Sequence, residues 1–144
     1  MKNTIAIGTT AEIELTVTEN KTVPNLYPES KLFQPMPKVF ATGFMVGFLE
    51  WACMEALAPH LDEGEQSVGI NVNVTHSAAT PVGMKVRAKA VCTGVEGQKT
   101  SWKVEAWDEK ELIGKGTHER FTINTERFNI KMAKKADPLL KLNC

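Results

Sequence analysis

The segment from residue 42 to residue 58 constrains the possible folds more than any other part of this sequence. Apolar residues recur along it at spacings of three and four, which predicts an α-helix. Its only charged residues are Glu50 and Glu55, so the helix is apolar on nearly every side. Such a helix is normally buried over most of its surface. The rest of the chain must therefore supply a surface that wraps around it.

Strand patterns lie on both sides of this helix in the sequence. Residues 11–18 alternate between apolar and polar side chains, with the two-residue period of a half-buried strand. Four further strand segments follow the helix, at residues 68–76, 84–95, 99–107 and 111–124. Consecutive strands joined by short turns favour an antiparallel meander, one face of which must cover the helix. The pattern predicts an α+β fold in which a curved antiparallel sheet wraps around one long central α-helix, the hotdog fold.

The remaining segments divide the chain into one domain and a tail. Residues 20–38 contain four prolines, and because proline removes backbone donors we expect irregular chain there. The chain is basic from about residue 129, and we expect it to be frayed. We assign residues 1–130 to a single hotdog domain and residues 131–144 to a basic C-terminal tail.

The composition argues against several classes of function. The 17 basic and 17 acidic residues cancel and form no long run of one sign, so we expect no binding to nucleic acid. We expect no signal peptide, because the first residues are mixed and no apolar stretch follows them. The sequence contains no uninterrupted apolar stretch of membrane-spanning length, so we also expect no membrane association. The three cysteines have neither metal-ligand nor disulfide spacing. We therefore expect reduced thiols, no bound metal and a cytoplasmic location.

Two ionisable residues lie where apolar ones would be ordinary. Glu50 lies in the middle of the predicted helix, and a lone buried carboxylate is costly unless it is paired or protonated. It either reaches water at a helix edge or acts as a catalytic carboxylate. His76 continues the face of the strand on which Val68, Ile70, Val72 and Val74 are expected to lie. It is either a core histidine with a backbone partner or a general acid or base.

Further candidates lie at the start of the helix and on the last strand. Thr42 is a favoured N-cap residue, and the free amides at a helix N terminus can also polarise a carbonyl group. Gly43 would let a ligand approach the backbone closely. Arg120 shares one strand face with two glycines and can bind a carboxylate or phosphate, the alternative being a surface salt bridge. We read His118, on the same face, as an ordinary strand residue.

Taken together, these segments resemble the fluoroacetyl-CoA thioesterase family. The similarity covers about residues 22–130 without gaps. Its longest segments are L-Y-P-E-S (26–30), V-F-A-T-G-F-M-V-G-F-L-E-W-A-C (39–53), V-T-H-S-A-A-T-P (74–81), V-E-G-Q-K-T-S-W (95–102), I-G-K-G-T-H-E-R (113–120) and R-F-N (127–129). Long ordered segments of this kind are far more specific than a short motif.

The resemblance implies a hotdog fold, a homodimer with its sites at the subunit interface, and an acyl-CoA substrate. It implies that the catalytic residues are Thr42, Glu50 and His76. It implies that Gly69 and Arg120 contact the substrate. The family's fluoroacetate-selective member gates its acyl pocket with two phenylalanines of the proline-rich loop. Phe33 matches the first of these, whereas Met36 replaces the second.

We therefore predict a thioesterase that hydrolyses a short-chain acyl-CoA without a cofactor, since coenzyme A is part of the substrate. Glu50 would attack the thioester or activate a water molecule, and His76 would move protons. A non-catalytic acyl-CoA-binding protein and an enoyl-CoA hydratase are the alternatives. Eight residues of regular helix would separate Thr42 from Glu50 by about 12 Å along the axis. Three arrangements remain open. The helix begins after Thr42, or the two side chains meet around the substrate, or two chains contribute to one site.

Overall fold

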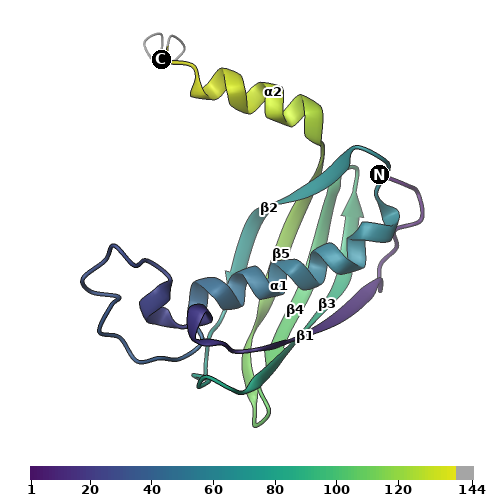
Figure 1. Cartoon of the computed structure of the whole chain (residues 1–144). Helices are drawn as coiled ribbons and strands as arrows, with labels where there is room; N and C mark the ends of the chain where they lie inside the picture. The colour runs from purple at the N-terminus through teal and green to yellow at the C-terminus, as the bar shows by residue number, and fades with distance from the viewer. Residues whose placement is uncertain (139–144) are drawn as a thin grey trace.

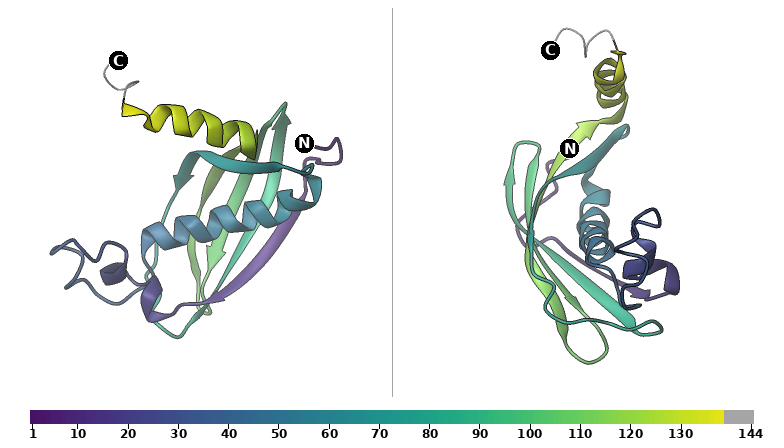
Figure 2. Two further views of the ribbon diagram at one scale, coloured as in Figure 1. Left: turned by 45° about the horizontal axis from the view of Figure 1, so that its top comes forward. Right: turned by 90° about the vertical axis from the view of Figure 1, so that its left-hand side faces the viewer.

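A computed structural model describes residues 1–138 and consists of one curled antiparallel sheet, a central helix and a second helix at the end of the described chain (Figure 1). The strands are β1 (Thr10–Thr16), β2 (Glu65–Val74), β3 (Lys85–Glu96), β4 (Lys99–Trp107) and β5 (Leu112–Asn124). The helices are α1 (Thr42–Leu57) and α2 (Thr125–Ala136). The strand order is β1-β3-β4-β5-β2, so β1 and β2 are the edges. Figure 2 shows the sheet curving around α1, which confirms the predicted α+β hotdog fold.

The core lies between α1 and the concave face of the sheet. Alanines on β3 and β4 let the helix approach the strands closely, and Trp102 of β4 is the largest fully buried side chain. The buried residues of α1 are Met45, Phe48, Leu49, Ala52, Cys53, Ala56 and Leu57. Burying one large apolar side chain contributes about 1.5–3 kcal/mol to stability. The expectation that this nearly apolar helix is covered on most sides is confirmed.

The helix begins at Thr42, but Thr42 is not its N-cap. The N-cap is the buried Ala41, whose backbone is extended and whose carbonyl accepts a hydrogen bond from the Met45 N–H at 2.9 Å. Alanine has no side-chain acceptor, so the cap makes no side-chain hydrogen bond. The prediction of an N-cap threonine is therefore wrong by one residue. The Thr42 hydroxyl bonds to another partner instead.

A β-bulge changes which side chains of β2 share a face. Val68 lies opposite Phe121 on β5, whereas Val72 lies opposite His118, and the register shifts between Gly69 and Asn71. The extra residue in the bulge reverses the alternation of sides along the strand. Val68 therefore lies on the other face from Val72, and the prediction that the four apolar residues of this strand share one face is wrong.

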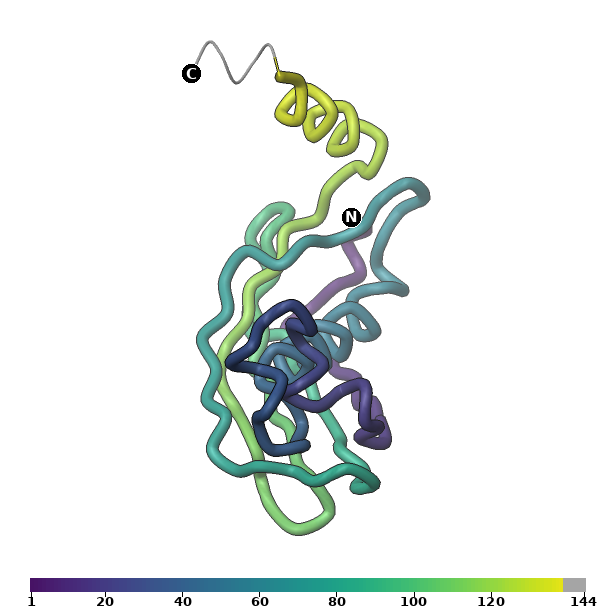
Figure 3. Tube along the Cα trace, turned by 60° about the vertical axis from the view of Figure 1, so that its left-hand side comes forward, coloured from purple at the N-terminus to yellow at the C-terminus, as the bar shows by residue number. Residues whose placement is uncertain are grey.

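Apart from two short 3₁₀ helices at Glu19–Lys21 and Val23–Asn25, the proline-rich segment is irregular, as predicted. It lies against the N-terminal end of α1 (Figure 3). Its base is held by an ion pair between Lys38 Nζ and Glu19 Oε1 at 2.6 Å. A hydrogen bond from the Val23 N–H to the Val39 carbonyl, at 3.0 Å, closes the same base. The loop is thus anchored at both ends beside the start of the helix.

The prediction of a frayed chain from residue 129 is wrong for its described part, because α2 runs to Ala136. The Asn124 side chain caps this helix by accepting from the Arg127 N–H at 3.0 Å. The positive charges of the lysines in its last turn interact favourably with the helix dipole. The boundary predicted at residue 130 falls inside α2, which projects beyond the end of the sheet (Figures 1 and 2). Neither α1 nor α2 combines the length and the apolar character that crossing a membrane requires.

Candidate active site

The first residue of α1 and the chain just after β2 form a bonded pair. The Thr42 hydroxyl and His76 Nδ1 lie 2.7 Å apart. The other ring nitrogen, Nε2, is buried and has no hydrogen-bond partner among residues 1–138. Burial lowers the pKa of His76, and the backbone of Ala78 opposes that shift. The pair thus consists of a hydroxyl group and a histidine whose neutral form is favoured.

A second group of predicted residues meets halfway along α1. Glu50 Oε2 lies 3.8 Å from Arg120 Nη1, and the Arg120 side chain is only 4% exposed, against 36% for Glu50. Gly69 of β2 lies beside both groups, and a Cβ atom there would lie 3.2 Å from Glu50 Oε1. Glu50 therefore faces a buried cation on the concave side of the sheet and still reaches the surface.

The structure does not bring these two groups together within one chain. The helix includes Thr42, so it does not begin late enough to fold Thr42 back toward Glu50. Eight helical residues separate them by about 12 Å along the axis. Thr42 with His76, and Glu50 with Arg120 and Gly69, are therefore two separate groups of candidate residues, which we call the first and the second candidate half-site.

The three other predicted substrate-binding residues lie toward the Thr42 end. A Cβ atom on Gly43 would lie 3.1 Å from the Leu26 side chain, so the proline-rich loop packs directly against this glycine. In the same loop, the Phe33 ring packs against Tyr27 with a centroid distance of 5.5 Å. Met36 is exposed. Close loop packing accounts for the glycine at position 43, and its contact with substrate stays a prediction.

The sequence reasoning left out two residues that complete the second candidate half-site. His118 is 2% exposed, with Nδ1 2.7 Å from the Asn71 carbonyl oxygen and Nε2 3.1 Å from Arg120 Nη1. Ser67 accepts from Arg120 Nε and Nη2, through its hydroxyl and its carbonyl, at 2.8 Å each. The position of His118 on the same face as Arg120 was an available signal. The sequence held no signal for a single serine on a neighbouring strand.

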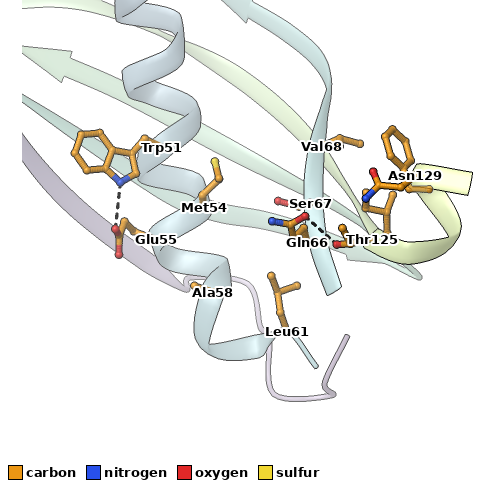
Figure 4. A pocket seen from close by; sticks show the side chains of 12 residues that line it. Trp51, Met54, Glu55, Ala58, Leu61, Gln66, Ser67, Val68, Thr125 and Asn129 are labelled. Atoms are coloured by element: carbon orange, nitrogen blue, oxygen red, sulfur yellow. Dashed lines mark hydrogen bonds between the residues drawn. The ribbon is translucent and has the colours of Figure 1, made fainter. Parts of the chain in front are cut away.

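A pocket of about 460 Å³ opens between α1, β2 and α2 (Figure 4). Trp51 and Met54 of α1 form one wall, and Asn129 of α2 lies on the other side. Phe128 of α2 also lines the pocket. None of the eight predicted site residues lines it. It meets the site only through Ser67, so it lies beside the reactive groups. Across the described chain, no three histidine, cysteine, aspartate or glutamate side chains are grouped to hold a metal ion.

Comparison with known proteins gives concordant matches. The profile of the family described as "Fluoroacetyl-CoA-specific thioesterase" matches residues 17–126. The fluoroacetyl-CoA thioesterase of Streptantibioticus cattleyicolor is 49% identical over 135 residues, which cover 94% of this chain and 97% of that protein.

Solved structures agree in fold and in sequence. A structure of fluoroacetyl-CoA thioesterase superposes with a TM-score of 0.91 at 47% identity, covering 94% of this chain and 100% of that one. A Thermus thermophilus member of the thioesterase superfamily superposes with a TM-score of 0.82 at 32% identity, covering 92% and 93% of the two chains. Because its fold, the family profile and these relatives agree, the chain belongs to the fluoroacetyl-CoA-specific thioesterase family.

Proposed function

We propose that this acyl-CoA thioesterase hydrolyses short acyl groups with Glu50, Thr42 and His76, and that two chains of a homodimer jointly form each site. The observation that carries the proposal is the position of Glu50. This carboxylate lies in the middle of the core helix, faces Arg120 and Gly69, and is separated from the Thr42–His76 pair of its own chain.

The edge strand β2 supports a dimer. Along an edge strand one row of backbone N–H and C=O groups has no partner strand, which makes the edge a template for pairing with a second chain. The side chains of Ile70 and Val72 on β2 are exposed, as are Trp51 and Met54 on the neighbouring face of α1. A second copy paired along β2 would cover this apolar surface and bring its own Thr42–His76 pair toward Glu50.

The chemistry follows from the groups present. Glu50 attacks the thioester carbonyl, the C–S bond breaks to give a mixed anhydride, and water hydrolyses that anhydride; alternatively, Glu50 removes a proton from the attacking water. His76 delivers a proton to the departing thiolate of coenzyme A. Donors at the start of α1 polarise the carbonyl. This sequence of steps yields the free acid and coenzyme A and requires no metal or redox cofactor.

The acyl pocket should accept more than one short chain. A mutant of a fluoroacetyl-CoA-specific thioesterase has been solved in complex with fluoroacetate and CoA, and it matches 86% of this chain at 49% identity. Here Met36 replaces an aromatic gate, and methionine is flexible and fills irregular space. We therefore propose that fluoroacetyl selectivity is relaxed. The buried free thiols of Cys53 and Cys92 support a cytoplasmic location.

The first test is thiol release from acetyl-, fluoroacetyl-, propionyl- and benzoyl-CoA by the wild type and Glu50→Gln. We expect kcat to fall by about 100-fold or more in the variant, since acid–base groups contribute about 10²–10⁴-fold. Glu55→Gln is the matched control, because Glu55 lies on the same helix and accepts a hydrogen bond from Trp51 Nε1 rather than facing Arg120. Turnover retained by Glu50→Gln would contradict the proposal. No wild-type turnover on any thioester would favour the acyl-CoA-binding alternative, and hydration of crotonyl-CoA would favour the hydratase.

Mixing two inactive variants tests the shared site. Unfolded together and refolded at equal concentration, Glu50→Gln and His76→Ala chains form heterodimers in which one site receives both wild-type residues. If the two chains share each site, the mixture should show about a quarter of the wild-type activity. If each site lies within one chain, mixing should restore no activity. That result would contradict the proposal that two chains share each site.

A further inference from the structure

The ring of His118 is held in one protonation state by two different partners. Its Nδ1 lies 2.7 Å from the Asn71 carbonyl, and a carbonyl oxygen can only accept a hydrogen bond, so Nδ1 carries the proton. Its Nε2 lies 3.1 Å from Arg120 Nη1, and a guanidinium can only donate, so Nε2 is unprotonated. Both bonds together require neutral His118.

The carbonyl partner of His118 lies in the β-bulge of β2. Asn71 directly follows the register shift, where the regular ladder to β5 is interrupted. A bulge leaves backbone groups available for partners outside the ladder. His118 therefore ties the bulge beside Gly69 to the guanidinium of Arg120.

All three nitrogen atoms of the Arg120 guanidinium form hydrogen bonds. Nε and Nη2 donate to the hydroxyl and the carbonyl of Ser67, and Nη1 donates to His118. Because the guanidinium is a rigid planar fork, these bonds fix its orientation. The same Nη1 faces Glu50 Oε2 at 3.8 Å. The bonds thus decide where the positive charge lies relative to the carboxylate.

We propose that His118 and Ser67 are positioning residues, which clamp Arg120 across β2 and β5 so that Nη1 faces Glu50. They act on hydrolysis through Arg120 and Glu50 and do not touch the substrate. This inference rests on the proposed catalytic role of Glu50. Around His118 in the described chain, the groups that affect its charge are Arg120 and Glu119 on β5 and Glu50 on α1. Protonation of His118 would remove the acceptor for Nη1 and place a second cation beside Arg120.

Two substitutions of His118 separate its two bonds. In His118→Asn the amide N–H group replaces Nδ1 and keeps the bond to Asn71, whereas the acceptor for Arg120 is lost. In His118→Gln the longer side chain carries its amide oxygen toward the position of Nε2 and keeps that acceptor. We expect His118→Asn to lower kcat about 10–100-fold, because a small misplacement at a reacting centre can cost up to about 100-fold. We expect KM to change little, and His118→Gln to retain most of kcat.

The readouts distinguish this inference from the proposal on which it rests. Thermal unfolding checks that each variant is folded. Ser67→Ala removes the acceptor for Arg120 Nε, so it should lower kcat as His118→Asn does. In a Glu50→Gln background, His118→Asn should cause no further loss of residual turnover, because the two residues act as one unit. The positioning role would be overturned if both His118 variants lost the same fraction of kcat, or if only KM changed. It would also be overturned if His118→Asn lowered the residual turnover of Glu50→Gln further. Full turnover by Glu50→Gln itself would instead overturn the proposed function.

Discussion

At the scale of single residues, Gly69 is the point at which three side chains of the second candidate half-site meet. A Cβ atom there would lie 3.1 Å from His118 Cε1, 3.2 Å from Glu50 Oε1 and 3.6 Å from Arg120 Nη1. The first two distances are shorter than an ordinary van der Waals contact. The His118 ring is held by two hydrogen bonds, so the Glu50 carboxylate is the group free to move.

We therefore expect Gly69→Ala to displace the Glu50 carboxylate and to lower kcat about tenfold or more, because small misplacements at a reacting centre can cost up to about 100-fold. Stability should change little, since the displaced carboxylate reaches the surface. Thiol release and thermal unfolding measure the two effects. A variant with wild-type kcat would show that the close approach of Glu50 to Gly69 has no part in turnover.

At the scale of the elements, the pairing of β2 with β5 depends on two glycines of β5. A Cβ atom on Gly116 would lie 2.0 Å from the Asn73 carbonyl oxygen and 2.7 Å from the Val74 Cα. A Cβ atom on Gly114 would lie 2.5 Å from the Thr75 carbonyl oxygen. These neighbours are backbone atoms, which cannot rotate away as a side chain can. The two glycines therefore leave no open space on this face of β5, because β2 and the chain that leads to His76 fill it.

Gly116→Ala should force β2 away from β5 and lower the free energy of unfolding by about 1–3 kcal/mol, the usual cost of overpacking, or more. Gly94→Ala is the matched control, because its Cβ atom would make an ordinary 3.6 Å contact with the Ser101 Cβ. The control should stay within about 0.5 kcal/mol of the wild type. Urea unfolding of both variants at one protein concentration gives the comparison. Equal stabilities would mean that the two strands adjust to the added methyl group.

At the scale of the whole molecule, the two site histidines couple stability to pH. Burial is the main cause that lowers the pKa of His76, and burial also lowers that of His118, with a further contribution from Arg120. Below the ordinary histidine value of about 6.5, the unfolded chain binds protons at these positions that the folded chain does not. Their contribution is thus complete above that value and is lost as the pH falls toward the lowered values.

The free energy of unfolding should therefore fall as the pH is lowered from about 7 through 6.5, before the acidic residues titrate. His118→Gln should show a smaller fall, because one of the two titrating rings is gone. Urea unfolding across this range at constant ionic strength measures the slope. A flat profile in the wild type, or equal slopes in the two proteins, would contradict this account.

The layers of the fold could be predicted from the sequence, and so could a set of candidate site residues. The apolar period of residues 42–58 and the alternation of the strands are local properties, so they predict the helix and the sheet without knowledge of tertiary contacts. Glu50 and His76 became candidates because each is an ionisable side chain at a position where the pattern predicts apolar residues. The resemblance to one family then assigned roles to them.

The tertiary structure alone decided how these residues are grouped. The bulge at Ile70 reverses the sides of β2, and such a register shift arises from strand pairing and not from local pattern. His118 bonds to Asn71, 47 residues away in sequence, and Arg120 bonds to Ser67, 53 residues away. Periodicity carries no information on contacts at such separations. The clamp that directs Arg120 toward Glu50 therefore follows from the way β2 pairs with β5. The separation of Thr42 from Glu50 follows instead from the single helix that holds both residues.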